Sequence, residues 1–143
     1  MIEGMDILQP VVVLAGWTMV MWAWMYATRL PAMGAAKVDP DKLASDPTTT
    51  LDDLLPAKVQ WKAHNYNHLH EAPTVFYAVA LVLAVIGQGG GLNAQIAWAY
   101  VALRIVHSLV QATVNKVMLR FMVFALSSLC LIALIVQAGL ALF

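Results

Sequence analysis

The sequence is poor in charged residues and almost lacks cysteine. Charged residues make up 11% of the 143 residues, whereas soluble domains hold about 25%, and hydrophobic residues make up 62%. The 8 basic and 8 acidic residues cancel, so the basic field that a nucleic-acid partner needs is missing. The single cysteine, Cys130, excludes an internal disulfide. With a mean hydropathy of +0.76, the composition indicates an integral membrane protein.

Long stretches without charge predict four membrane spans in one domain. A helix needs about 20 apolar residues to cross a bilayer core about 30 Å thick. The sequence predicts spans at about 8–30, 58–87, 93–115 and 119–142, with a polar cytoplasmic loop over 31–57. We expect 58–87 to be one continuous helix, about 45 Å long, whose polar first half projects beyond the hydrocarbon. The short later connections predict an all-α, up-down-up-down four-helix bundle.

The distribution of basic residues predicts the orientation of this bundle. Arg29, Lys58 and Lys62 flank the first loop, and Lys116 and Arg120 flank the third, while the N-terminus and the second loop have no Lys or Arg. Because cytoplasmic loops carry the excess of Lys and Arg, both termini are expected on the outer side. In a bacterium, this places the protein in the inner membrane with periplasmic termini.

Polar residues recur along one face of the third predicted span. At about 100° per residue, this face holds five side chains over three turns: Arg104, His107, Ser108, Gln111 and Asn115. Ionisable residues within a membrane are costly and usually face the interior of a bundle. The face therefore predicts a functional site inside the bundle.

The second predicted span carries a matching polar face. His64, His68 and Glu71 follow each other at intervals of four and three residues, with Asn67 beside them. Two imidazoles one turn apart and a carboxylate also have a spacing that a metal uses, but no fourth ligand is evident. We therefore expect no metal and assign these residues to a polar pocket.

Glu71 and Arg104 are expected at the same depth, about 18 to 20 Å along helices that start and end on the cytoplasmic side. One interpretation is a buried ion pair that fixes the helix register. The other is an anion-binding cavity, because Arg104, Lys116 and Arg120 are the only full charges after Glu71. Both interpretations remain open from the sequence.

The motif Arg104-Ile105-Val106-His107-Ser108, followed by Arg120 at the start of the fourth span, resembles the MAPEG family. These are the membrane-associated proteins in eicosanoid and glutathione metabolism. The order of the four spans, the long first loop and the Asn67, Glu71 and Pro73 region are also similar, so the resemblance covers the whole chain. Within this family, the sequence is similar to a subgroup found widely in proteobacteria.

The resemblance implies a homotrimer that binds glutathione between subunits and takes a lipophilic small-molecule substrate from the membrane lipids. It implies that Arg120 stabilises the glutathione thiolate, and that a polar set binds glutathione. This set comprises Arg104, His107, Asn67, Glu71, His64, His68, Gln111, Lys116 and Arg29. A guanidinium beside a thiol lowers the pKa of the thiol, and the thiolate is the reactive form.

The family pattern aligns with the second span in two registers. Anchored on Glu71, His68 occupies the position of the family asparagine; anchored on Pro73, Asn67 occupies it and His70 takes the place of the glutamate. In the third span, Gln111 stands where many members that use glutathione have tyrosine. The sequence leaves both registers open.

Two functions follow from this resemblance. The first is a glutathione-dependent transferase or peroxidase that acts on lipophilic electrophiles or lipid hydroperoxides. The alternative is a non-catalytic, lipid-binding or scaffold member of the same family, since altered glutathione ligands on a preserved fold suit that role.

Overall fold

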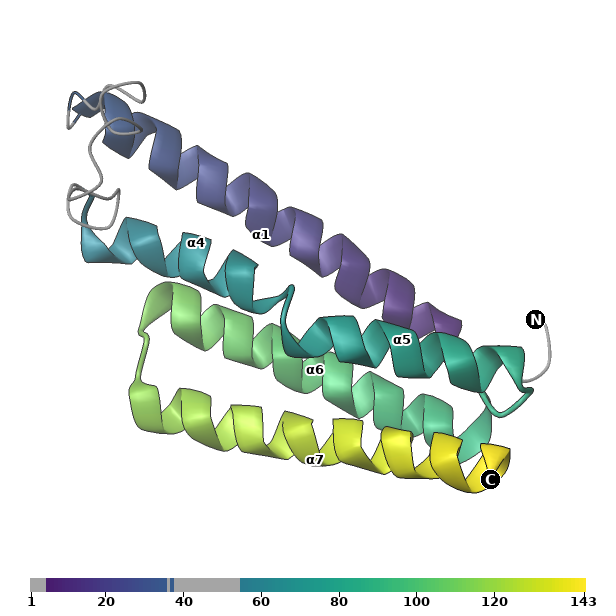
Figure 1. The fold of residues 1–143 in the computed structure, drawn as a ribbon. Helices are drawn as coiled ribbons and strands as arrows, with labels where there is room; N and C mark the ends of the chain where they lie inside the picture. Colours follow the sequence, from purple (N-terminus) through teal and green to yellow (C-terminus); the bar gives the residue numbers. More distant parts are fainter. Residues whose placement is uncertain (1–4, 36, 38–54) are drawn as a thin grey trace.

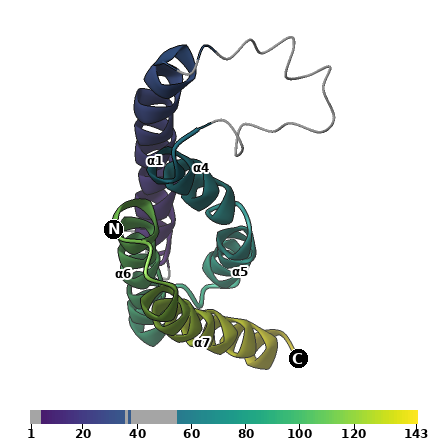
Figure 2. The ribbon, with the colours of Figure 1, turned by 90° about the vertical axis from the view of Figure 1, so that its left-hand side faces the viewer.

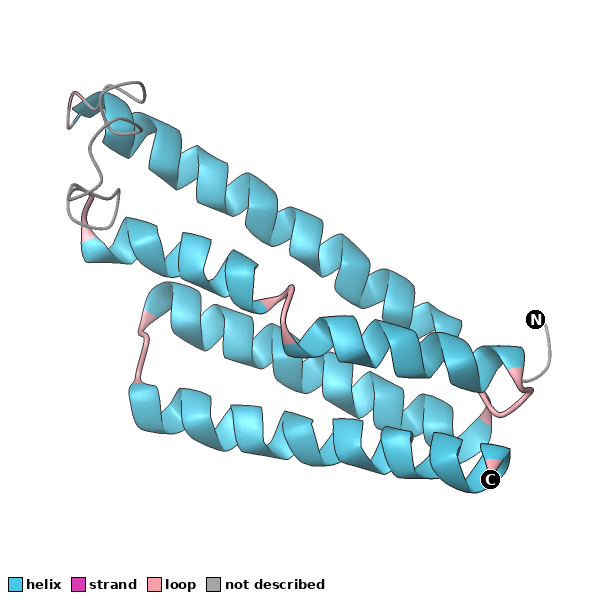
Figure 3. Ribbon diagram, in the orientation of Figure 1, coloured by secondary structure: helices cyan, strands magenta, loops and turns pink. Residues whose placement is uncertain are grey.

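The computed structural model describes residues 5–35, 37 and 55–143, and these form five α-helices and no strand (Figure 3). The helices are α1 (Leu8–Ala35), α4 (Ala57–His68), α5 (Ala72–Val85), α6 (Gly91–Thr113) and α7 (Val117–Leu142). The all-α fold class predicted from the sequence is therefore confirmed. Most of the predicted polar loop lies outside the described residues.

The helices run up and down in one bundle (Figure 1). α1 runs in one direction, α4 and α5 together return, α6 runs back beside them, and α7 ends at the end of the bundle where α1 begins. α6 contacts α1, α4 and α7, and the end-on view shows it between α1 and α7 (Figure 2). At the end where α1 begins, the Ile7 N–H donates a hydrogen bond of 2.8 Å to the Gly89 carbonyl in the α5–α6 turn.

Within the described part of the chain, three stretches are long and apolar enough to cross a membrane: Leu8–Ala35, Ala57–Val85 and Val117–Leu142. α6 has 23 residues, which give it about 35 Å of length. Its lower apolar content comes from the polar residues on one face. α6 lies between membrane-length helices, so its polar face is turned away from lipid.

The first helix is longer than predicted. The expected span ended at residue 30, but α1 continues through Pro31 to Ala35. Proline removes one hydrogen bond from a helix interior and usually kinks or ends it. Here the helix continues past the proline for four more residues, so Pro31 misled the prediction of the boundary.

The second span is broken, and the prediction of one continuous helix over 58–87 was wrong. α4 ends at His68, the chain turns through 69–71, and α5 begins at Ala72 (Figure 1). Pro73 explains the break, because it has no N–H to offer the carbonyl of Leu69 and its ring clashes with that carbonyl. Within the break, the Thr74 hydroxyl donates a hydrogen bond of 2.6 Å to the His70 carbonyl.

Gly87 ends α5 with a Schellman motif. Its φ is 76°, the Gln88 N–H donates to the Leu83 carbonyl at 2.8 Å, and the Gly87 N–H donates to the Ala84 carbonyl at 3.2 Å. A left-handed residue with these two bonds satisfies carbonyls that the helix end leaves free. The predicted separation of the second and third spans in this region is therefore accounted for.

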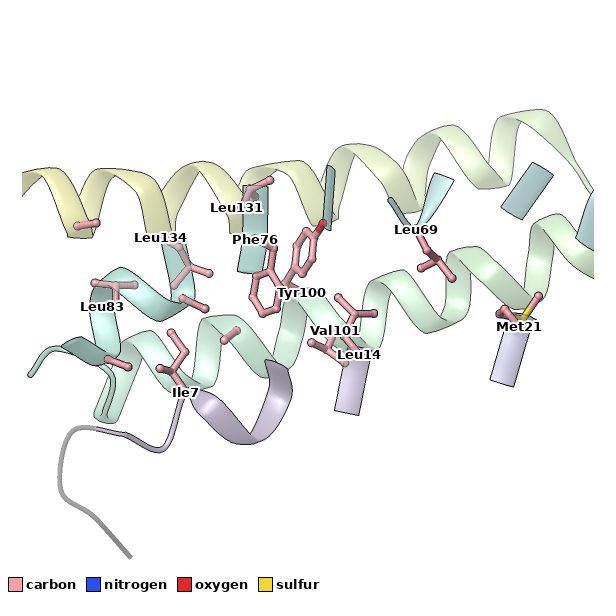
Figure 4. Close-up of a cluster of buried hydrophobic side chains, with 14 of the residues drawn as sticks. Ile7, Leu14, Met21, Leu69, Phe76, Leu83, Tyr100, Val101, Leu131 and Leu134 are labelled. Atoms are coloured by element: carbon pink, nitrogen blue, oxygen red, sulfur yellow. The ribbon is translucent and has the colours of Figure 1, made fainter. Parts of the chain in front are cut away.

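The apolar core lies in the half of the bundle where α1 begins (Figure 4). The Phe76 and Tyr100 rings stack with centroids 4.5 Å apart and planes 21° from parallel. Leu131 and Leu134 from α7 and Leu14 from α1 belong to the same buried cluster. The cluster contains residues of all four spans and extends through Met21 and Leu69 toward the polar residues of α6.

Asn115 forms the tight turn between α6 and α7. Its φ is 49°, in the left-handed region, and its side-chain oxygen is buried without a hydrogen-bond partner. A glycine at this position adopts the left-handed conformation without steric cost and has no side-chain oxygen to leave unsatisfied. For a β-branched residue, the same conformation costs about 1–2 kcal/mol of free energy.

We therefore expect Asn115→Gly to raise the unfolding free energy by about 1 kcal/mol and Asn115→Val to lower it by a similar amount or more. Thermal unfolding in detergent, followed by circular dichroism, measures both changes. Equal midpoints for the two variants would contradict the left-handed conformation.

Candidate functional site

The polar face predicted on the third span is buried within the bundle. Arg104 and Gln111 are each 2% exposed, His107 is 6% exposed, and Ser108 is fully buried. Asn115 lies beyond the end of α6, in the turn. The helical spacing in the sequence therefore located four of the five polar residues on one buried face.

A cavity of about 330 Å³ opens beside this face. It lies where α4 gives way to α5, against α6 and the first two turns of α7. The lining residues are His68, Glu71, Ala72, Arg104, His107, Val117, Arg120, Phe121 and Phe124. One wall is thus polar and the other, on α7, is largely apolar.

Hydrogen bonds connect the end of α4 to α6 at this cavity. Arg104 Nη2 donates to the His68 carbonyl at 3.4 Å, and His68 Nδ1 lies 3.0 Å from Gln111 Oε1. A cation at the C-terminal end of a helix is favourable for the helix dipole. Arg104 therefore holds the end of α4 in place as well as lining the cavity.

Several polar atoms of the cavity residues have no hydrogen-bond partner among the residues that the structure describes. Arg104 Nε, Arg120 Nε and His107 Nδ1 are all buried and unpartnered. Leaving a buried donor unsatisfied costs about 1–3 kcal/mol, and more for a charged group. Three such atoms belong to residues around one cavity, so these residues retain hydrogen-bonding capacity that the described chain does not use.

The charges around the cavity favour an anion. Apart from its histidines, the ionisable lining consists of two guanidinium groups, from Arg104 and Arg120, and one carboxylate, from Glu71. Val117 is the first residue of α7, so the positive end of that helix dipole adds to the same field. Arginine suits this role because it stays charged and offers several donors to a carboxylate or thiolate.

The ion pair between Glu71 and Arg104 is not formed. Both residues line the cavity, as their predicted depths required, but the Glu71 side chain is exposed and Arg104 donates to the His68 carbonyl instead. The break in the second span explains this outcome, because it removes Glu71 from the helical face on which the prediction placed it.

Five other predicted site residues do not line the cavity. Gln111 is buried on α6, Asn67 and Lys116 are exposed, and His64 on α4 and Arg29 on α1 are half-buried. His64 has interactions of its own. His68 and Glu71 line the cavity, whereas His70 is exposed and hydrogen-bonded to Tyr66, so the geometry favours the register anchored on Glu71.

Among the residues that the structure describes, no three His, Cys, Asp or Glu side chains gather closely enough to hold a metal. The spacing of His64, His68 and Glu71 depended on a continuous helix. Because α4 ends at His68, the three side chains do not converge.

The apolar wall of the cavity was not predicted from the sequence. Val117, Phe121 and Phe124 line it together with Arg120. Counted from Val117, the other three residues lie at i+3, i+4 and i+7 along α7. This spacing is the pattern of a single helix face. The signal was present, but in an apolar membrane span phenylalanines are indistinguishable by composition from residues that face lipid.

Comparisons with known proteins agree with this architecture. No curated protein and no solved structure gives a significant match. Residues 7–140 match the family model described as the MAPEG family. The match includes all five helices, except for the last residues of α7, and every residue that lines the cavity. The chain is therefore an integral membrane protein that belongs to the MAPEG family.

Proposed function

We propose that the protein is a glutathione-dependent transferase or peroxidase that acts on lipophilic electrophiles or lipid hydroperoxides. The observation that supports this proposal most directly is the cavity between α4, α6 and α7. It combines two guanidinium groups, whose Nε atoms are buried and unpartnered, with the phenylalanine rings of α7. Neighbouring walls of the cavity thus suit a polar, anionic thiol and an apolar electrophile.

In this proposal, Arg120 stabilises the thiolate. Arg104 and His107 bind the carboxylates of the tripeptide, and Glu71 binds its amino group, since an exposed carboxylate at the rim of a cationic cavity suits an ammonium ion. Opposite charge beside a thiol favours its ionised form, and the thiolate is the nucleophile. Phe121 and Phe124 contact the lipophilic partner.

The proposal also extends to the assembly and its location. The protein is a homotrimer in a bacterial inner membrane, with both termini in the periplasm. In support, Arg29, Lys58, Lys62 and Lys116 belong to the end of the bundle where α1 ends and α7 begins, and positive residues favour the cytoplasmic side.

The first test is a titration of reduced glutathione into the detergent-solubilised protein, with the ultraviolet absorbance of the thiolate as the readout. We expect a saturable thiolate signal in the wild type and a loss of at least about tenfold in Arg120→Ala, because a pKa shift of one unit or more follows from a neighbouring opposite charge. Lys58→Ala removes a cation from the same end of the bundle and serves as the control.

A wild type that stays folded and oligomeric but gives no thiolate signal would contradict the enzymatic proposal. That result would instead favour the non-catalytic, lipid-binding or scaffold role. An equal signal in wild type and Arg120→Ala would leave thiol binding intact and remove Arg120 from its proposed role.

A further inference from the structure

We propose that His68 is the base that takes the proton from the bound thiol and later returns it to the electrophile. This inference rests on the proposed function and adds to it a proton-transfer residue. The proton transfer is worked out below for an electrophile that accepts a thiol by addition, an alkene conjugated to a carbonyl group. The argument begins from the two contacts that fix the His68 ring and backbone.

The hydrogen bond to Gln111 fixes the tautomer of His68. Gln111 Oε1 lies 3.0 Å from His68 Nδ1. An amide oxygen only accepts hydrogen bonds, so Nδ1 carries the hydrogen and, in the neutral ring, Nε2 keeps its lone pair. Because the ring lines the cavity and Nδ1 is engaged, Nε2 is the nitrogen available to a ligand.

The surroundings hold this ring in position. Gln111 is 2% exposed on α6, so its amide oxygen is a fixed acceptor rather than a mobile surface group. Arg104 holds the backbone of His68 through its carbonyl. A base that is oriented by a third group, next to the group it deprotonates, is the arrangement that activates nucleophiles in general.

The cavity places an acceptor for the proton beside groups that stabilise the thiolate. Arg104 and Arg120 line the same cavity as His68 and favour a thiolate, and Glu71 lies at the rim. His107 completes the ionisable groups, with its ring centroid 6.5 Å from that of His68. Arginine does not accept a proton, so a histidine is needed to take it.

The proton balance closes within the site. The S–H bond breaks and an N–H bond forms at His68 Nε2, which leaves a thiolate beside Arg120 and an imidazolium bonded to Gln111. The thiolate then attacks the β-carbon of the alkene, a C–S bond forms, and the π electrons move to the carbonyl side. That carbanion takes the proton from Nε2, so thiol and alkene become a thioether and His68 is neutral again.

The experiment counts the protons released when glutathione ionises on the protein. Reduced glutathione is added at mildly alkaline pH in weakly buffered detergent solution with an indicator dye, and the thiolate absorbance is read in parallel. S-methylglutathione, which has no thiol, corrects for protons released by other groups. We expect the wild type to form thiolate with little proton release, because the proton remains on His68.

His68→Asn separates this role from a structural one. Asparagine keeps a donor for Gln111 but has no second nitrogen, so any thiolate formed must release its proton to water. We expect one proton released per thiolate in this variant and about a hundredfold slower addition to an unsaturated ketone, the loss usual for a general base. His70→Asn is the matched control, since His70 is exposed and bonds to Tyr66.

A second pair of variants tests the orientation of the ring by Gln111. Gln111→Met removes the acceptor at similar volume, and Gln111→Glu restores one. Nitrogen NMR of His68 should show hydrogen on Nδ1 in the wild type and in Gln111→Glu, and on Nε2 in Gln111→Met, with a lower addition rate in Gln111→Met than in Gln111→Glu.

The possible outcomes are distinct. Release of one proton per thiolate by the wild type would overturn the role of His68 and leave the proposed glutathione-dependent function standing. Absence of any thiolate in the wild type would remove both proposals. An unchanged addition rate in His68→Asn would also overturn the inference, whatever the NMR shows.

Discussion

Arg104→Met is expected to weaken glutathione binding by about a hundredfold or more while leaving the bundle folded. Arg104 is 2% exposed, and its Nε atom is buried without a partner. Removing one partner of a buried, charge-assisted contact costs about 2–5 kcal/mol of binding free energy, and about 1.4 kcal/mol corresponds to tenfold in affinity. Isothermal titration of reduced glutathione into both proteins measures the difference.

Stability is expected to change much less than affinity, because two effects oppose each other. Methionine forgoes the hydrogen bond to the His68 carbonyl, worth about 1.5–3 kcal/mol for a charged donor, and the distance of 3.4 Å places it at the weaker end. In exchange, methionine avoids the cost of burying a guanidinium, and such replacements are often neutral.

Two further results decide whether this account of Arg104 is right. Arg104→Lys keeps the charge but lacks the planar fork of donors, so we expect an intermediate affinity. A large fall in the thermal midpoint of Arg104→Met with unchanged glutathione affinity would show that the residue only fixes α4, and would rule out its place in the binding site.

The helix faces were predictable where a helix is unbroken. On α6 the spacing of Arg104, His107, Ser108 and Gln111 placed all four on one side, and all four are buried. Exposing an ionisable side chain to lipid is costly. The sequence therefore predicted that this face points into the bundle. The same reasoning applied to α4 placed Glu71 on the face of His64 and His68, and it failed because the helix ends first.

The break itself had a visible signal that was given too little weight. Pro73 lies within the predicted second span, and proline removes the hydrogen bond to the carbonyl four residues earlier. Membrane helices often continue through proline, because neighbouring groups satisfy the freed carbonyl. α1 does so at Pro31, whereas the second span does not at Pro73, and the sequence around each proline does not distinguish the two cases.

Contacts between helices were the least predictable part of the site. The hydrogen bond between His68 and Gln111 joins residues 43 positions apart, and its geometry depends on how α4 docks against α6. Helical spacing gives the direction of a side chain on its own helix but not the partner it meets on another. The Arg104 contact with the His68 carbonyl is likewise set by where α4 ends.

Phe76→Ala is expected to lower the unfolding free energy by about 2–3 kcal/mol. In water, truncating a buried phenylalanine costs about 3–5 kcal/mol, part of it a transfer term and part a cavity term. In a membrane the transfer term is small, because lipid is as apolar as the core and helices associate through packing. The cavity term remains, together with the stacking of Phe76 on Tyr100, worth about 0.5–1.5 kcal/mol.

Val85 on the same helix provides the matched control. It is 82% exposed, whereas Phe76 is fully buried, so Val85→Ala is expected to change stability by less than about 0.5 kcal/mol. Both variants are compared by denaturant unfolding in detergent. Because Phe76 packs α5 against α6 and does not itself line the cavity, its loss is expected to lower the folded fraction but leave the glutathione affinity of the folded protein unchanged. Equal stabilities for the two variants would show that the stacked pair does not hold α5 against α6.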